Sequence, residues 1–332
     1  MNASRCTRRT SGFARGFTLI ELLLVVFILA AVAATAISLV DQDDQQLRYE
    51  DTQRRLQAIR RATVGPEPGP GPVLLGGFVA DVGRLPATIQ ELLDPGATPA
   101  YQVDPLLGIG AGWRGPYLSV LPRIDGAVAF PDGWGLAGID PPNYGWEVTV
   151  DSLANSLHVE SYGSDGLDGG SEGYARDYPT AALVADADIR VDLTGWTIEC
   201  TVVNQGGSTF TGSVRLRLAY PQDGSLAWAL SPGPSWPASE AERNAASYLS
   251  LKQDFSLAPA SAESRSFVFV RDSVAGDPPK LVPCGRRALI LVHEDSGAPV
   301  GSLANGAGPP AQVAIVARTA APVGIGITWR IP

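Results

Sequence analysis

The sequence predicts an α+β protein: a long N-terminal membrane-spanning helix packed on a small antiparallel sheet, followed by a C-terminal β-sandwich. Two observations support this. Residues 17–63 join an apolar run to a polar segment of strong helix formers. Beyond about residue 144, short alternating apolar and polar stretches are divided by Pro, Gly and Ser. The predicted organisation is a leader, a transmembrane helix, a helical stalk, a globular domain and a sandwich domain, at residues 1–16, 17–40, 41–64, 65–180 and 181–332.

The apolar run at residues 17–40 contains a single charged residue, Glu21. A helix needs about 20 apolar residues to cross a bilayer, so the run is long enough. Only arginines carry charge before it, and acids follow directly after it, which predicts a cytoplasmic N-terminus and an exported remainder. An ordinary signal peptide has a shorter apolar core and a small-residue cleavage site, so that interpretation is disfavoured. A carboxylate inside a membrane is costly and usually has a function and a partner.

Residues 41–63 are predicted to continue this helix outward as a stalk. The segment has no Gly or Pro, and Leu47, Leu56 and Ile59 recur at roughly helical spacing. Acids open the segment, while Arg60 and Arg61 close it, which complements the helix dipole. The stretch GPEPGPGP that follows cannot continue a helix.

The segment Gly16-Phe17-Thr18-Leu19-Ile20-Glu21, after a basic leader and before an apolar run, resembles the processing motif of type IV pilins and pseudopilins. The resemblance implies cleavage between Gly16 and Phe17 by prepilin peptidase, followed by methylation of Phe17. It also implies that Glu21 pairs with the N-terminal amine of a neighbouring subunit during filament assembly. Such pairing would offset the cost of a charge in the membrane in the assembled subunit, but not in an unassembled one.

Residues 12–180 are similar to the major pseudopilin of type II secretion. FVADVGRLPAT, at residues 78–88, matches an Asp-x-Gly-x-x-Pro-x-Thr pattern. GWRGPYL at 112–118 and PDGWGLAGI at 131–139 resemble the family's Gly-Pro-Tyr and Asp-x-Trp-Gly elements. The chain departs from the family by insertions around 65–72 and 93–112, and by Leu136 in place of the usual asparagine.

An Asp- and Gly-rich stretch at residues 162–179 is the candidate metal site. Calcium takes six to eight oxygen ligands, and glycines allow backbone carbonyls to turn inward. The spacing differs from that of an EF-hand, so a solvated acidic turn is the alternative. The resemblance implies calcium in this loop, and the candidate ligands are Asp165, Asp168, Glu172 and Asp177.

The family pattern ends near residue 180, and alternating strands follow. In GWTIECTVVN, at residues 195–204, one face carries Trp196, Ile198, Cys200 and Val202. Several such strands in about 150 residues predict a β-sandwich with immunoglobulin-like topology. Cys6 would be lost with the leader, which leaves Cys200 and Cys284. These form a possible disulfide in an exported domain, with two free thiols as the alternative.

The sequence contains no pattern typical of an enzyme. Nucleophile elbow, phosphate loop and zinc motifs are missing from it, and His158 and His293 lie in predicted strands. Trp113, Trp134 and Trp146 could form a sugar platform, but core packing is the favoured role for most of them. Loss of the four leader arginines changes the net charge from −9 to −13, which argues against nucleic acid as a partner.

Three functions therefore remain as expectations. The first is a structural subunit of a type II secretion pseudopilus, assembled into a periplasmic filament that helps to export proteins. The second is a surface type IV pilin whose C-terminal β-sandwich binds a receptor or glycan, and the third is a membrane-anchored exported enzyme. The first implies a single-pass inner-membrane protein with its C-terminal domains in the periplasm. Its expected partners are other pseudopilin subunits, prepilin peptidase and the inner-membrane secretion assembly platform.

Overall fold

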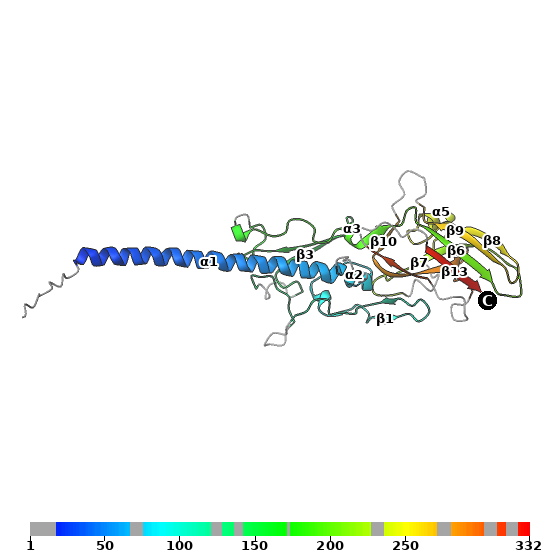
Figure 1. Cartoon of the computed structure of the whole chain (residues 1–332), viewed down its shortest axis with the longest axis horizontal. Coiled ribbons are helices and arrows are strands. Elements are labelled where there is room, and N and C mark those ends of the chain that lie inside the picture. The colour runs from blue at the N-terminus through cyan, green and yellow to red at the C-terminus, as the bar shows by residue number, and fades with distance from the viewer. Residues whose placement is uncertain are drawn as a thin grey trace, which may run out of the picture. The chain divides into compact units, whose positions relative to one another are not determined.

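The computed structural model describes residues 18–66, 76–120, 128–135, 142–170, 173–226, 236–270, 280–301, 311–316 and 325–332, and the side chains of all of these except 36–42 and 325. The chain divides into two compact units, Met1–Tyr49 and Glu50–Pro332. Its secondary structure is mixed: one long helix is followed by short helices and mainly antiparallel sheets (Figure 1).

Helix α1 runs from Leu19 to Val64 without a break (Figure 1). The predicted continuation of the apolar helix into residues 41–63 is therefore confirmed. Among the residues whose side chains are described, no helix is both long enough and apolar enough to cross a membrane. The predicted span, residues 17–40, includes Phe17 and residues 36–40, which lie outside that part of the chain.

In the unit from Glu50 onward, the end of α1 packs against a small core. Leu56, Ile59 and Ala62 of α1 are buried there. The other elements of this region are α2 (Phe78–Val82), η1 (Gln90–Leu92), β3 (Trp146–Asp151), β4 (Ser156–Ser161) and η2 (Gly173–Ala175). Strands β3 and β4 pair antiparallel, as predicted, and contribute Trp146 and Val159 to the same core. The end of α1 and the small antiparallel sheet thus contribute to one hydrophobic core.

The C-terminal residues form a second core between two sheets. One sheet has the order β12-β11-β7-β8 and the other has the order β13-β6-β9. Their bounds are β6 (Thr197–Asn204), β7 (Phe210–Ala219), β8 (Gln253–Leu257), β9 (Ala262–Val268), β11 (Gly285–His293), β12 (Ala311–Ile315) and β13 (Ile325–Ile331). All neighbours pair antiparallel except β13 and β6, which pair parallel. Both sheets contribute side chains to one hydrophobic cluster, and their arrangement as an immunoglobulin-like sandwich stays a prediction.

Alternation along β6 was predicted correctly. Trp196, just before the strand, and Ile198, Cys200 and Val202 in it are all buried. Phe267 of β9 lies opposite Ile198 and is fully buried as well. A period of two places every second side chain on the core face of a strand, which is why this pattern could be read directly.

A hairpin from the first half of the chain joins the C-terminal core. Strands β1 (Gln102–Val103) and β2 (Gly110–Ala111) pair antiparallel. Leu107, Ile109 and Ala111 are buried in the same cluster as the two C-terminal sheets. Between the two cores, α3 (Asp186–Ile189) leads into β5 (Arg190–Asp192), which pairs antiparallel with β10 (Leu281–Pro283).

Cys200 and Cys284 are both free cysteines in the structure, which corresponds to the second of the two alternatives left open for this pair. Cys200 faces the core from the middle of β6, whereas Cys284 lies between β10 and β11, where its backbone N–H donates to Ile189 O. Burial raises the pKa of the Cys200 thiol to about 12 and that of Cys284 to about 11. Both thiols are therefore poor nucleophiles at neutral pH.

Candidate functional site

The N-terminal candidate site is described from Thr18 onward, so Gly16 and Phe17 lie outside the described residues. Glu21 lies in the first turn of α1, where its Oε2 accepts hydrogen bonds from the backbone N–H and the hydroxyl of Thr18, each at 2.9 Å. The Glu21 N–H in turn donates to Thr18 Oγ1 at 3.3 Å. This is a reciprocal capping box, which satisfies N–H groups left without partners at the start of a helix.

The capping role of Glu21 was missed from the sequence. A Thr followed three residues later by Glu, just before an apolar run, is the pattern typical of a capping box. The sequence therefore contains the signal for this second role of Glu21. The two roles are compatible, since a carboxylate can accept several hydrogen bonds.

The first pseudopilin-like element forms a polar cluster around Asp81, which is 6 % exposed. Tyr117 donates a hydrogen bond to Asp81 Oδ2 at 3.2 Å, and Arg114 Nε lies 3.1 Å from the same atom. Burial raises the pKa of Asp81 above its ordinary value, although Arg114 and Tyr117 oppose the shift. These residues come from two separate sequence elements, and their contacts hold α2 against the 112–118 segment.

The Asp-x-Trp-Gly element also has a structural role. Asp132 is 1 % exposed, accepts the Ser161 hydroxyl at 2.6 Å and caps the turn through the N–H groups of Trp134 and Gly135. The N–H of Gly133 donates to Thr52 Oγ1 of α1 at 3.0 Å. The element therefore ties the stalk end of α1 to the end of β4.

Of the three tryptophans considered for a sugar platform, Trp146 is fully buried, and its Nε1–H donates to Phe130 O. Trp113 packs against the same core and donates to Glu91 O. Trp134 lies at a tilt against Tyr174, with ring centroids 6.1 Å apart. At least two of the three are core residues.

The acidic loop, residues 162–179, is anchored at the end of β4. Ser161 and Tyr178 exchange two backbone hydrogen bonds, of 2.8 and 3.1 Å. Asp165 Oδ1 accepts the Leu167 N–H at 3.1 Å, and Asp177 Oδ2 accepts the Gly169 N–H at 2.8 Å. A Cβ on Gly170 would lie 1.6 Å from Ala175 O, so the loop closes on itself at a point where only glycine fits.

Negative charge gathers at this loop. Burial raises the pKa of Glu160, and the nearby carboxylates of Glu147, Asp177 and Asp168 raise it further. Asp177 Oδ1 is buried without a hydrogen-bond partner among the described residues. A cation at this point would satisfy that oxygen and lower the repulsion.

The four predicted calcium ligands are brought together only in part. Within the described residues, no group of three or more His, Cys, Asp or Glu side chains is arranged to hold a metal ion. Glu172 lies outside the described residues. The fit to calcium therefore rests on Asp177 and on the electrostatic coupling of Asp168, Asp177 and Glu160.

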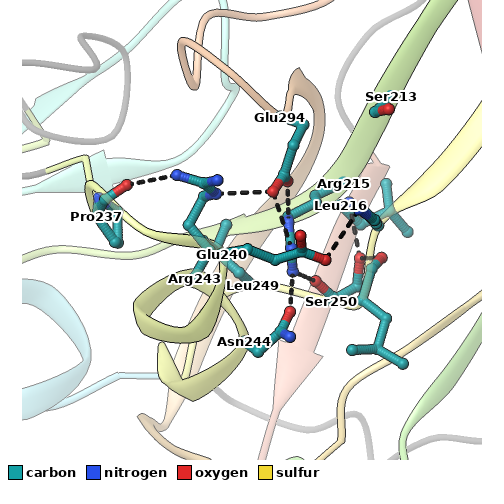
Figure 2. A network of polar contacts seen from close by, with 12 residues as sticks. Ser213, Arg215, Leu216, Pro237, Glu240, Arg243, Asn244, Leu249, Ser250 and Glu294 are labelled. Carbon is teal, nitrogen blue, oxygen red and sulfur yellow. Dashed lines mark hydrogen bonds and ion pairs between the residues drawn. The ribbon is translucent and has the colours of Figure 1, made fainter.

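A buried ionic network in the C-terminal region was not foreseen from the sequence (Figure 2). Glu294 follows β11 and accepts hydrogen bonds from Arg215 of β7 and, at 2.7 Å, from Arg243 of α5 (Glu240–Ala245). Arg215 is 0 % exposed and also donates to Asn244 Oδ1 and Ser250 O. Glu294 thus bridges two cations that hold the α5 segment on the sheet.

Lys280 also contacts the α5 segment and the residues that follow it. It is 2 % exposed, and its Nζ donates to the carbonyls of Asn244, Ala246 and Leu249. A cation at the carbonyl end of a helix satisfies acceptors and suits the helix dipole. The sequence SVRLRLAY, residues 213–220, shows only alternation, which places Arg215 on the outer face of its strand. The segment that covers Arg215, with Asn244 and Ser250, comes later in the chain.

Comparison with family models finds a prokaryotic N-terminal methylation motif at residues 13–37. Comparisons with curated proteins and with solved structures find no match. The matched residues include Gly16, Phe17 and Glu21, the residues of the predicted processing motif. The chain therefore carries the N-terminal methylation motif found in type IV pilins and pseudopilins, which indicates a pilin-like protein that prepilin peptidase processes and that assembles with other subunits.

Proposed function

We propose that the protein is a structural subunit of a type II secretion pseudopilus. The observation that carries this proposal is the methylation motif at residues 13–37, which continues into one unbroken helix, α1. Its membrane topology would be a single pass through the inner membrane, with a cytoplasmic N-terminus and a periplasmic remainder. The Asp81 and Asp132 clusters support the choice of a pseudopilus, since they are built from the elements that resemble secretion pseudopilins.

The role is structural rather than enzymatic in this proposal. The titratable clusters described above are engaged in holding elements together: Asp81 with Arg114, Asp132 with Ser161, and Glu294 with Arg215. The C-terminal region, residues 181–332, would be an immunoglobulin-like β-sandwich presented outward. A domain of this size favours a minor or specialised subunit, because each copy in a tight filament would have to accommodate it.

A surface type IV pilin is the second candidate. The methylation motif occurs in pilins as well as pseudopilins, and a large C-terminal β domain would suit binding of a receptor or glycan. The presence of a secretion ATPase and a secretin beside the gene would favour the pseudopilus. A pilus-retraction apparatus in their place would favour the surface pilin.

Processing tests the proposal directly. When the full chain is expressed with prepilin peptidase, we expect intact-mass analysis to show the loss of residues 1–16 and the gain of one methyl group on Phe17. Glu21→Leu should be cleaved and inserted equally well but should fail to assemble, because the partner for the neighbouring amine is gone; chemical cross-linking in intact cells measures this as a loss of oligomers.

The inactive-peptidase strain is the control for cleavage, and the wild-type chain is the control for assembly. A mature chain that begins elsewhere than Phe17 would end the pilin assignment. Filaments of Glu21→Leu in normal amount would show that the Thr18 capping box is the main role of this glutamate.

We also propose that the acidic loop binds calcium, with Asp165, Asp168, Glu172 and Asp177 as the candidate ligands. Asp177 Oδ1, a buried oxygen without a described donor, is the observation that supports this. A bound divalent cation would stabilise the closed loop by mass action and would offset the repulsion at Glu160. Calcium suits a flexible oxygen-lined loop better than magnesium, which requires near-octahedral geometry and keeps its waters.

Calcium should therefore raise the melting temperature of the processed protein, and magnesium should do so much less. At 100 times the dissociation constant, binding adds about 2.7 kcal/mol to the free energy of unfolding. Asp177→Asn retains an acceptor for the Gly169 N–H but removes the charge, so we expect it to lose the calcium response. Thermal melts with chelator, calcium or magnesium measure this, and equal melting of the wild-type protein in all three would refute the site.

A further inference from the structure

A groove of about 790 Å³ lies between α1, from Glu50 onward, and the segment at residues 178–183. This volume falls within the usual range of ligand sites in proteins. The exposed residues of its helix wall are Glu50, Arg54, Gln57 and Arg61. They follow one another at intervals of three or four positions, so they form one stripe along the helix. The helix therefore contributes a continuous polar wall to the groove.

Positive charge dominates this wall, although the chain as a whole is acidic. Arg54 exposes 69 % of its side chain, and its ion pair with Asp51 is long, at 3.9 Å. Asp51 is held more closely by Arg55, at 2.7 Å. Arg61 is exposed and forms no ion pair with any described residue. The guanidinium groups of Arg54 and Arg61 are thus available to a ligand.

The opposite wall offers backbone groups. Tyr178 and Val184 form antiparallel bridges with Ser161 and Leu157 of β4. Between these bridges the wall advances by six positions (184 − 178) and β4 by four (161 − 157), so the two are not paired continuously. Within the described residues, the backbone N–H and C=O groups of residues 180–182 have no hydrogen-bond partner. The wall therefore retains donors and acceptors for a further chain.

A helix on one side and unpaired backbone on the other suit an extended peptide that adds as a strand. In this mode the peptide backbone bonds to the wall, and every second side chain points to the same side. Arg54 and Arg61 are seven positions apart, which is about 10.5 Å along the helix. Side chains two and four residues apart in an extended chain are separated by about 7 and 14 Å. Acids at alternate positions of a peptide therefore bracket the distance between the two arginines.

The groove also has an apolar lining. Leu56, which lies between the two arginines in the sequence, contributes to it, and so do Leu183 and the alanines at 181 and 182. An apolar side chain between the two acids would cover this surface. An acidic glycan would satisfy the arginines, but it has no apolar side chain for this lining and no regular series of amides for residues 180–182.

We propose that this groove binds an extended acidic peptide segment of a partner protein, with two acids separated by an apolar residue at alternate positions. The acids lie at Arg54 and Arg61, the apolar side chain contacts Leu183, and the peptide amides pair with residues 180–182. Glu50, at the start of the stripe, disfavours a further acid there. This assignment goes beyond the filament role and applies to a pseudopilus subunit and a surface pilin alike.

Fluorescence polarisation with the processed full-length protein in detergent tests the proposal. The probe is a labelled peptide of sequence Thr-Glu-Thr-Leu-Thr-Glu-Thr. We expect saturable binding that weakens as the salt concentration rises, because exposed charge pairs are screened. Replacement of both glutamates by glutamine should weaken binding by about tenfold. N-methylation of two successive amides should weaken it as well, because one of any two successive amides faces the wall in a strand.

Variants of the protein supply the second measurement. Arg54→Gln/Arg61→Gln should weaken binding of the acidic peptide by about tenfold. Both side chains are exposed, so the fold is expected to be unaffected. Arg48→Gln is the matched control, since Arg48 belongs to the same helix, exposes 47 % of its side chain and lies outside the groove. Arg60 also lines the groove but is left unchanged, because it pairs with the buried Asp188 at 3.1 Å.

The outcomes decide between a peptide site and a merely cationic surface. Binding that is weakened by Arg54→Gln/Arg61→Gln and by N-methylation, but not by Arg48→Gln, would establish the site. No saturable binding, or equal affinity for the glutamate and glutamine peptides, would overturn it. Binding that ignores N-methylation and is matched by dextran sulfate would indicate a surface for acidic polymers and would overturn it too. Cleavage and assembly of the double variant should match the wild type, so failure of the groove leaves the proposed function intact.

Discussion

Glu294→Ala should lower the free energy of unfolding by about 3–5 kcal/mol, which is typical when one partner of a buried ion pair is removed. The side chain of Arg215 is 0 % exposed and that of Arg243 is 12 % exposed, so neither guanidinium can recover its lost contacts in water. The α5 segment, which these contacts hold on β7 and β11, should loosen first. Thermal or denaturant unfolding of the processed protein in detergent measures the change.

Glu263→Ala is the matched control for this variant. Glu263 also pairs with an arginine, Arg265 of the same strand, but both side chains are about one-third exposed or more. Surface ion pairs contribute between 0 and about 1 kcal/mol. Equal destabilisation by the two variants would contradict a special role for the buried network.

The pH dependence of Glu294 has a definite sign. Burial acts to raise its pKa, but the hydrogen bonds and charges of Arg215 and Arg243 outweigh burial, so the pKa lies below the ordinary value of 4.5. A carboxyl group with a lowered pKa in the folded state stabilises the protein above its unfolded pKa and loses this as the pH falls through the folded value. The wild-type protein should therefore lose part of its stability below about pH 4.5, and Glu294→Gln should show a smaller loss in that range.

Gly83→Ala should lower the free energy of unfolding by at least about 3 kcal/mol. It should also weaken the contact between the end of α2 and the segment at Pro221. Gly83 follows α2 with φ of +87°, a left-handed conformation that disfavours side chains. A Cβ there would lie 1.9 Å from Pro221 O. Backbone on both sides must shift to relieve this overlap, and the nearby hydrogen bond from Gly224 N–H to Val82 O (2.8 Å) would be strained.

Gly195→Ala separates the effect of the left-handed backbone conformation from the effect of the steric overlap. Gly195 has nearly the same φ, +83°, but a Cβ there meets nothing within 4 Å. Gly195→Ala should therefore lower the free energy of unfolding only by the strain of a left-handed conformation, about 1–2 kcal/mol. If both variants lose the same stability in parallel unfolding measurements, the close approach to Pro221 contributes nothing.

Much of the local structure could be predicted from the sequence. The absence of Gly and Pro from residues 17–63 was enough to predict α1, because helix propensity and spacing act over a few neighbouring residues. Alternation was enough to predict which side chains of β6 face the core. The short strand β8 is hard to predict, although Phe255 and Leu257 alternate with polar residues, since five residues give a weak signal among Ser- and Ala-rich neighbours.

The candidate site at the N-terminus was also readable from the sequence. Gly16, Phe17 and Glu21 form a compact motif that needs only order and spacing to be recognised, and its family model matches there. The capping contact of Glu21 with Thr18 is equally local, since donor and acceptor are three positions apart.

The helix, the strand faces and the processing motif follow from local sequence patterns, because each depends on residues that lie within a few positions of one another. Which distant residues meet is a property of the folded chain alone. Arg215 and Glu294 are 79 positions apart, and Arg287 donates to Ala80 O across 207 positions. The same holds for the free state of Cys200 and Cys284 and for the groove between α1 and residues 178–183. Such contacts depend on how the cores pack and on which segments cover them, and no spacing along the chain encodes that.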